Sequence, residues 1–244
     1  MKYSIIVPAY NEEKIIDTTI DSLYRFLQEN KLDFELIIAN DGSKDQTVDK
    51  VRGKLKQYKN LKIVSNPQNK GRGAVLTRAL QAAKGEICVY VDADLSIDLS
   101  LFPQLLFAIE QGADVAIGSK HLKDSEVEYP KLRRLASKGY SFLTRFLLQS
   151  KVKDYQCGFK AFKKDVVHTV LPYVKEEGWS WDTEINVKSE WAGYRVTELP
   201  AKVVNVYGRE SKVHLFRDIK RMGLNLFKLW REKGKYKELL RRNV

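Results

Sequence analysis

Short apolar runs alternate with segments of helical apolar spacing through the first half of this 244-residue chain. Each run has the length of a buried strand, and the segments between them place apolar residues every three or four positions. Such alternation is typical of a mostly parallel sheet with right-handed crossovers and helices on its faces. We therefore predict a Rossmann-like α/β fold, with strands expected at 3–7, 34–39, 61–65, 86–91 and 114–118.

Polar side chains follow the carboxyl end of each of the first four predicted strands. Ligands of open parallel sheets bind at that edge. Neither a G-x-G-x-x-G motif nor a Walker lysine loop occurs, which disfavours a dinucleotide dehydrogenase and a P-loop nucleotidase. We therefore expect a nucleotide whose phosphate charge is met by a metal ion and by basic side chains. The residues at these ends are Tyr10 and Glu12, Asp41 and Asp45, Lys70 and Arg72, and Asp92 and Asp94.

The stretch from Cys88 to Ser96 takes an apolar strand directly into two carboxylates, Asp92 and Asp94, which flank one alanine. In extended backbone, alternation points both side chains to the same side. Two hard oxygen ligands at the end of a strand suit Mg²⁺ or Mn²⁺ carrying a phosphorylated substrate. Ordinary loop aspartates are the alternative, because Asp is frequent after strands.

The second half of the chain shows a weaker pattern. Asp182 and Glu184 stand at the start of a predicted helix, where they either complement the helix dipole or serve a site. Residues 154–160 are predicted to form a polar turn. An aromatic-rich stretch at 136–149 belongs either in the core or at a membrane interface. A basic amphipathic helix is expected from residue 214 to 230.

The net charge of +12 is concentrated in two segments, since residues 120–164 and 209–244 each hold 12 Lys and Arg against four Asp and Glu. Such segments attract nucleic acid, anionic lipid or phosphorylated ligands, although many basic segments are merely solvated faces. No helix-turn-helix, zinc finger or aromatic RNA-binding motif accompanies the charge. We therefore expect no nucleic-acid partner.

No apolar run reaches the ~18 residues needed to cross a bilayer, and the first residues run into a predicted strand rather than a signal peptide. Two cysteines, Cys88 and Cys157, provide no disulfide framework. We therefore expect a cytoplasmic protein. Its basic and aromatic segments would attach it peripherally to the cytoplasmic face of a membrane.

Three motifs follow one another at characteristic spacings, namely Val7 to Glu12, Asn40 to Asp45 and Asp92 to Asp94. Together they resemble the motif series of family-2 inverting glycosyltransferases, which have the GT-A fold. The resemblance implies a GT-A catalytic domain, with a mostly parallel central sheet flanked by helices.

Three further segments, 118–120, 154–160 and 181–184, are similar to one branch of that family. This branch glycosylates polyprenyl phosphates and includes dolichyl-phosphate β-glucosyltransferases and dolichol-phosphate mannose synthases. Since the resemblance reaches about residue 212, we expect a catalytic domain over 1–212. Residues 213–244 would form a basic amphipathic helical extension.

The resemblance also implies three groups of site residues. Binding of the nucleotide sugar is expected at Pro8, Tyr10, Glu12, Asp41, Asp92 and Lys120. A divalent metal, Mg²⁺ or Mn²⁺, is expected at Asp92 and Asp94. The acceptor phosphate is expected at Arg133, Ser137, Arg209, Ser211 and Lys212. Lys120 stands where the family more often has Arg, which removes a bidentate phosphate fork.

The implied reaction is metal-dependent transfer of a hexose, with inversion, from a nucleotide sugar to a polyprenyl or dolichyl phosphate. UDP-glucose is the favoured donor; the alternatives are a GDP-mannose-dependent mannose synthase and a family-2 transferase acting on a glycan hydroxyl. The candidate catalytic residues are Asp92, Asp94, Asp182 and Glu184. A phosphate acceptor has its second pKa near ~6, so it needs cations to hold it more than a base to activate it.

Overall fold

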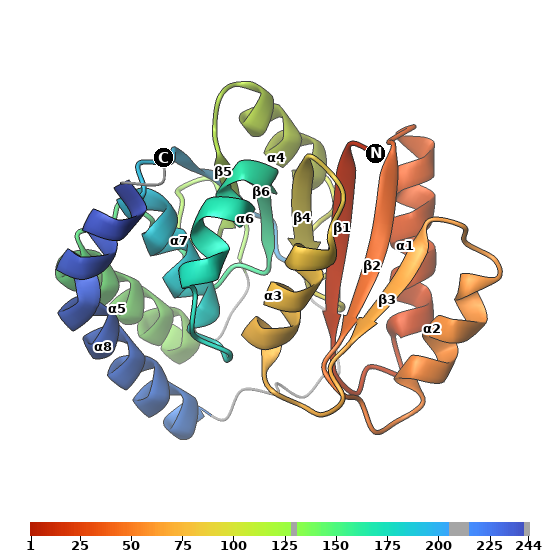
Figure 1. Ribbon diagram of the computed structural model, residues 1–244, viewed down its shortest axis with the longest axis horizontal. Helices are drawn as coiled ribbons and strands as arrows, with labels where there is room; N and C mark the ends of the chain where they lie inside the picture. Colours follow the sequence, from red (N-terminus) through yellow and green to blue (C-terminus); the bar gives the residue numbers. More distant parts are fainter. Residues whose placement is uncertain (128–130, 205–214, 242–244) are drawn as a thin grey trace.

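One seven-stranded sheet forms the centre of the protein, as seen in a computed structural model that describes residues 1–127, 131–204 and 215–241 (Figure 1). The strand order is β3-β2-β1-β4-β6-β5-β7. Strands β1 to β4 pair in parallel, as do β5 and β7, whereas β6 runs antiparallel to both of its neighbours. The strands are β1 (Tyr3–Ala9), β2 (Phe34–Asn40), β3 (Leu61–Ser65), β4 (Ile87–Val91), β5 (Val115–Ser119), β6 (Phe159–Lys163) and β7 (Val196–Pro200).

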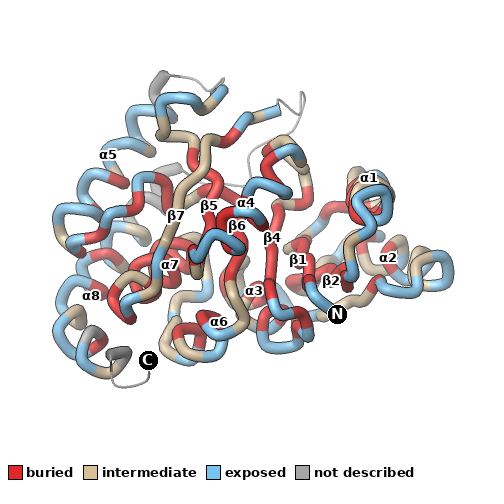
Figure 2. The backbone as a smooth tube through the Cα atoms, turned by 90° about the horizontal axis from the view of Figure 1, so that it is seen from above, coloured by how far each residue is buried: buried red, intermediate tan, exposed pale blue. Residues whose placement is uncertain are grey.

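Helices cover both faces of this sheet, with α3 and α6 on one face and α1 and α4 on the other (Figures 1 and 2). Helix α8 packs outside the sheet against α5 and α7. The helices are α1 (Ile16–Glu29), α2 (Thr47–Leu55), α3 (Arg72–Ala82), α4 (Leu101–Glu110), α5 (Lys131–Leu148), α6 (Lys164–Val170), the 3₁₀ turn η1 (Leu171–Tyr173), α7 (Trp181–Trp191) and α8 (Leu215–Arg241).

The predicted α/β fold is confirmed, and the five expected strands are present with ends shifted by at most two residues. Strands β1, β2, β4 and β5 are almost wholly buried, which explains why they appear in the sequence as continuous apolar runs (Figure 2). Both cysteines are buried and free. The boundary predicted at residue 212 lies outside the described residues and stays a prediction.

Strand β6 corrects the prediction of a polar turn at 154–160. The turn ends at Gly158, and Phe159–Lys163 then enters the middle of the sheet between β4 and β5. Its second residue is a lysine, Lys160, that is fully buried in the site described below. A charged residue in a buried strand breaks the apolar pattern by which a strand is detected.

Candidate active site

The two aspartates that follow β4 lie in a tight turn. The strand ends at Val91, the Leu95 N–H donates to the Asp92 carbonyl at 3.0 Å, and Leu95 has a φ of 47°. The Asp94 carboxylate accepts the N–H of Ser96 at 3.1 Å. The expectation of extended backbone through both residues is therefore wrong, although both carboxylates do lie at the carboxyl end of β4.

Gly158 gives the Asp92 carboxylate its space. The Asp92 N–H donates to the Gly158 carbonyl at 3.0 Å. A Cβ atom at Gly158 would lie only 1.8 Å from Asp92 Oδ2. The turn before β6 and the turn after β4 thus fit together closely, and any side chain at position 158 would displace the carboxylate.

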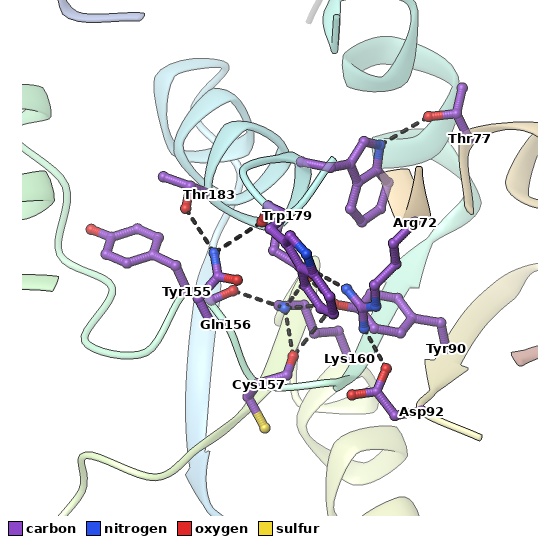
Figure 3. Close-up of polar contacts among 12 residues, drawn as sticks. Arg72, Thr77, Tyr90, Asp92, Tyr155, Gln156, Cys157, Lys160, Trp179 and Thr183 are labelled. Carbon is purple, nitrogen blue, oxygen red and sulfur yellow. Dashed lines mark hydrogen bonds and ion pairs between the residues drawn. The ribbon is translucent and has the colours of Figure 1, made fainter. Parts of the chain in front are cut away.

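Arg72, the first residue of α3, joins two carboxylates that are far apart in the sequence (Figure 3). Its Nη2 contacts Asp92 Oδ1 at 2.5 Å, and its Nη1 donates to the Asp182 carboxylate. The guanidinium carbon lies 5.2 Å from the ring centre of Tyr90 and 5.8 Å from that of Trp179, within the range of cation–π attraction. Burial alone would lower the pKa of Arg72, but Asp92 and Asp182 raise it well above its ordinary value.

Behind Arg72 lies a fully buried polar cluster of Lys160, Tyr90 and Asp182. Lys160 Nζ contacts Asp182 Oδ1 at 2.5 Å and the Tyr90 hydroxyl at 2.6 Å, and it donates to the backbone carbonyls of Tyr155 and Cys157. Burial by itself raises the pKa of Asp182, but Lys160 and Arg72 outweigh it and hold that pKa below its ordinary value. Asp182 is therefore ionised at neutral pH and lies next to the Asp92 site.

Of the residues predicted to bind the base and ribose, Asp41 has the best-defined environment. It is buried at the end of β2, and its carboxylate accepts the N–H groups of Lys70 and Gly71 at 3.0 and 2.8 Å and the side-chain amide of Asn66 at 2.9 Å. Asp41 therefore fixes the loop that leads to Arg72.

The other three predicted nucleotide residues near β1 lie at its carboxyl end. Pro8 is within the strand, and Tyr10 is half-buried just beyond it. Glu12 is buried, and its carbonyl accepts the N–H groups at the start of α1. Strands β1 and β2 are parallel neighbours, with Ala9 paired to Asn40, so these residues and Asp41 share one edge of the sheet. Their role toward a nucleotide stays a prediction.

Lys120 lies directly after β5 beside the turn that precedes β6. Its N–H donates to Asp154 at 2.9 Å, and its ammonium pairs with the same carboxylate at 3.3 Å. Burial raises the pKa of Asp154 on its own, yet Lys120 brings it below the ordinary value. The ammonium of Lys120 also donates to the Gln156 carbonyl at 3.4 Å, so Lys120 adjoins the turn that carries Gly158.

The predicted acceptor residues are only partly described. Ser137, on α5, contacts His121 Nε2 at 3.1 Å, which ties α5 to the loop after β5. Arg133 lies in the first turn of α5, and its side chain is outside the description. Arg209, Ser211 and Lys212 lie outside the described residues.

Glu184, two residues along α7 from Asp182, has a separate environment. Its carboxylate accepts the N–H groups of Lys175 and Glu176 at 3.0 and 2.7 Å and pairs with buried Lys188 at 2.5 Å. These contacts fix the loop before α7. The structure therefore brings Asp182, but not Glu184, into contact with the Arg72–Asp92 pair.

Arg72 was predicted only as one of the polar residues that follow the strands, and Tyr90, Lys160 and Trp179 were given no site role. One pattern could have indicated Tyr90, because it lies in β4 two residues before Asp92, and extended backbone would place the two side chains on one face. No local signal joins Lys160 or Arg72 to Asp182, since only the folded chain brings them together.

Asp92 and Asp94 fit an open metal site better than a closed one. Among the described residues no group of three or more His, Cys, Asp and Glu side chains could enclose a metal ion. Mg²⁺ commonly binds through one or two carboxylates and completes its shell with water and substrate phosphate oxygens. The Asp92 side chain is 36% exposed and has oxygen ligands to offer, so the pair suits a metal that arrives with a phosphorylated ligand.

Comparison with solved structures establishes the class of fold. Glucosyl-3-phosphoglycerate synthase from Mycobacterium tuberculosis, solved with uridine diphosphate, superimposes with a TM-score of 0.70 at 19% identity, over 95% of this chain and 79% of that one. The same enzyme in complex with Mn²⁺, UDP-glucose and phosphoglyceric acid also gives 0.70 at 19% identity, over 96% and 80%. The fold is that of the GT-A glycosyltransferases.

Sequence comparison then gives the family. The model of glycosyl transferase family 2 matches residues 4–171, and this chain belongs to that family and is a glycosyltransferase. It is 34% identical over 235 residues to glycosyltransferase AglD of Haloferax volcanii, covering 94% of this chain and 37% of that protein.

Two other relatives have names that specify an acceptor. The dolichyl-phosphate β-glucosyltransferase of Dictyostelium discoideum is 28% identical over 251 residues, covering 95% of this chain and 77% of that one. The dolichol-phosphate mannosyltransferase of Pyrococcus furiosus is 32% identical over 203 residues, covering 82% and 56%. The chain thus spans little more than a third of the Haloferax relative and just over half of the Pyrococcus one.

Proposed function

We propose that this protein transfers a hexose from a nucleotide sugar, with UDP-glucose favoured, to a polyprenyl or dolichyl phosphate with inversion at the anomeric carbon. The observation that carries the proposal is the Asp92–Arg72–Asp182 cluster at the carboxyl end of β4. It combines a partly exposed carboxylate, Asp92, with an ionised carboxylate, Asp182, that contacts two cations. The names of the dolichyl-phosphate relatives support the choice of acceptor.

A metal ion, Mg²⁺ or Mn²⁺, bound by Asp92 and Asp94 would stabilise the negative charge that develops on the leaving diphosphate. The M. tuberculosis enzyme of similar fold was solved with Mn²⁺ and UDP-glucose, which supports this cofactor. The base and ribose would lie along the edge formed by Pro8, Tyr10, Glu12 and Asp41.

The state of Asp182 favours a phosphate acceptor over a hydroxyl acceptor. A hydroxyl needs a general base whose pKa is near the working pH. Asp182 has its pKa lowered below the ordinary value and is occupied by Lys160 and Arg72, so it is a poor base. A phosphomonoester, with a second pKa of about 6, is already nucleophilic at neutral pH. Asp182 would instead counter positive charge near the donor.

Transfer to a glycan hydroxyl is the second candidate. Its test is a pair of variants, Asp182→Asn and Glu184→Gln, each of which removes a carboxylate base. Loss of transfer in both variants, with folding and Mn²⁺ binding unchanged, would favour a base-dependent hydroxyl acceptor. Retention of most activity in Glu184→Gln would agree with the structural contacts of that residue.

A donor and acceptor screen tests the proposal directly. Purified protein is incubated with radiolabelled UDP-glucose, GDP-mannose and other UDP-sugars, a short polyprenyl phosphate, and either Mn²⁺ or a chelator. We expect lipid-linked product from one donor, lost with chelator and in Asp94→Ala, but kept in Asp49→Ala, whose carboxylate is exposed on α2. Near-normal turnover of Asp94→Ala would contradict the metal assignment.

We further propose that helices α5 and α8 form the surface that meets the membrane. The two helices lie side by side at one end of the molecule (Figures 1 and 2). Most exposed large apolar side chains of the described residues are on them, namely Leu135, Phe142, Leu143 and Phe146 on α5 and Leu224, Phe227 and Trp230 on α8.

Helix α5 packs Tyr140, Leu147 and Leu148 toward the core, but its outer side departs from that of an ordinary surface helix. Ser141 and Thr144 face the protein, while Phe142 and Phe146 are 71% and 74% exposed. An ordinary surface helix turns its apolar stripe inward. A helix with apolar and aromatic residues outside, accompanied by exposed Arg145, fits an interface between water and lipid.

None of the helices in the described residues is long and apolar enough to span a bilayer. The proposed location is therefore the surface of a membrane, on its cytoplasmic face, where a lipid-phosphate acceptor is accessible. Basic residues add about 1 kcal/mol each near an anionic surface.

A further inference from the structure

The carboxylate proposed to hold the metal is paired with an arginine. Arg72 Nη2 lies 2.5 Å from Asp92 Oδ1, the type of oxygen that a divalent cation would use. A metal ion bound to Asp92 would therefore lie close to a guanidinium charge unless that charge acquires another anionic partner. Like charges at short range disfavour each other strongly where water is partly excluded.

Arg72 is held in place by more than its contact with Asp92. Its second terminal nitrogen, Nη1, donates to Asp182, and the guanidinium carbon lies over the rings of Tyr90 and Trp179 at 5.2 and 5.8 Å. The Arg72 side chain is only 14% exposed, against 36% for Asp92. The Asp92 carboxylate, the more exposed of the two partners, can therefore turn away from Nη2 while Arg72 stays where it is.

Leaving Asp94 aside, the charged groups that contact one another are balanced without any ligand. Asp182 and Asp92 carry two negative charges, and Lys160 and Arg72 carry two positive charges. A free divalent cation adds charge to a neutral cluster, whereas a metal arriving with a diphosphate brings its own anions. Diphosphate oxygens can accept the Nη2 hydrogen bonds that Asp92 gives up, and arginine is well suited to such phosphate contacts.

We propose that Arg72 makes metal binding at Asp92 depend on the nucleotide diphosphate. Without nucleotide, the guanidinium neutralises Asp92 and repels a free divalent cation. With nucleotide, the diphosphate replaces Asp92 as the acceptor of the Nη2 hydrogen bonds, and the carboxylate becomes available to the metal. This inference rests on the metal site of the proposed function and deepens it by giving the order of binding.

The test measures Mn²⁺ binding to the full chain by calorimetry and by the electron paramagnetic resonance of free Mn²⁺, with and without UDP or GDP. In the wild type we expect the diphosphate to raise Mn²⁺ affinity by about fivefold or more, the lower end of typical coupling between two ligands. In Arg72→Gln we expect Mn²⁺ alone to bind about fivefold or more tighter than to the wild type, and the coupling to shrink. Arg72→Lys keeps the charge and should retain most of the coupling.

Arg78→Gln is the matched control, because it makes the same substitution on the same helix, six residues beyond Arg72, at an exposed side chain. It should leave Mn²⁺ binding near that of the wild type. Equal Mn²⁺ affinity in the wild type with and without nucleotide, or Arg72→Gln binding free Mn²⁺ no tighter than the wild type, would overturn the inference alone. If neither the wild type nor any variant bound Mn²⁺, even in the presence of UDP or GDP, the proposed metal site itself would be wrong, and the inference with it.

Discussion

Gly158 is the residue on which the geometry of the site depends most sharply. Alanine at this position would place its Cβ atom 1.8 Å from Asp92 Oδ2, and the carboxylate would have to move. Since a misplacement of 1 Å costs on the order of 100-fold in rate, we expect Gly158→Ala to lower kcat/KM by at least about tenfold. The measurement is steady-state transfer at saturating Mn²⁺.

Gly53→Ala supplies the control for this change, because Gly53 lies in α2 and a Cβ atom there meets nothing within 4 Å. Alanine favours a helix over glycine by about 0.5–1 kcal/mol, so this variant should be at least as stable as the wild type. A Gly158→Ala enzyme with normal kcat/KM would show that Asp92 does not need its present position.

The contribution of Lys160 to stability can be measured against that of Lys163, a partly exposed lysine on the same strand. It is fully buried with Asp182, and breaking a buried pair by removing one partner costs about 3–5 kcal/mol because it leaves a charge without compensation. We expect Lys160→Met to lower the free energy of unfolding by about that amount in urea denaturation. Lys163→Met, on the same strand, breaks a pair with Asp114 that is partly exposed, and should cost about 0–1 kcal/mol.

The loss of stability caused by Lys160→Met should depend on pH, because the partner that it leaves behind, Asp182, is a titrating carboxylate. A carboxylate whose pKa is lowered by folding contributes stability that is present above its unfolded pKa and is lost as pH falls through the folded pKa. The penalty of Lys160→Met should therefore be full at pH 7 and shrink in acid. An equal penalty for both lysine variants at pH 7 would contradict the buried pair.

At the scale of elements, the regular first half of the chain was predictable because strands β1, β2 and β4 are buried on both faces and so appear as apolar runs. Strand β6 was not, because its buried lysine interrupts the pattern and its antiparallel insertion between β4 and β5 depends on long-range pairing. The same contrast between local signals and long-range contacts applies to the candidate site. The aspartates after β4 were found from local sequence, whereas Arg72 and Asp182 are 110 residues apart and meet only in three dimensions.

Helix α8 is a structural part of the core as well as a surface element. Leu226, Leu229 and Tyr236 belong to the buried core cluster, and Lys188 of α7 lies 3.7 Å from the centre of the Tyr236 ring. The basic extension expected from the sequence is thus anchored on its inner face. Its outer face keeps Phe227 and Trp230 exposed.

We predict that Leu226→Ala lowers the free energy of unfolding by about 2–5 kcal/mol, the usual cost of emptying a buried leucine site. Leu224→Ala, two residues away on the exposed face, should change it by less than about 0.5 kcal/mol. Thermal and urea unfolding measure both. Equal effects of the two substitutions would mean that α8 does not pack on α7 as described.

At the scale of the whole molecule, the positive charge and the exposed apolar side chains coincide at the α5–α8 end. The edge of the sheet at which we propose that the nucleotide binds carries acidic residues such as Glu12, Asp41 and Asp92. This separation suits an enzyme that takes a soluble donor on one side and approaches an anionic lipid on the other. Electrostatic attraction would bring the protein to the surface, and apolar insertion would hold it there.

Vesicle flotation tests this arrangement. We expect the wild type to bind vesicles that contain phosphatidylglycerol, and salt to weaken binding because exposed charges are screened. The double change of Phe142→Ser and Phe146→Ser should reduce binding by about tenfold or more, since each buried aromatic side chain contributes about 1.5–3 kcal/mol. Phe107→Ser removes an aromatic ring that is 61% exposed on α4, away from this surface, and should leave binding unchanged.

The same variants separate docking from chemistry. A short, water-soluble polyprenyl phosphate reaches the site without a membrane, so the double variant should transfer sugar to it at the wild-type rate. A long polyprenyl phosphate in vesicles requires docking, and its glycosylation should fall in the double variant but not in Phe107→Ser. Equal loss with both acceptors would place Phe142 and Phe146 in the active site instead. Unchanged vesicle binding would show that α5 does not face the lipid.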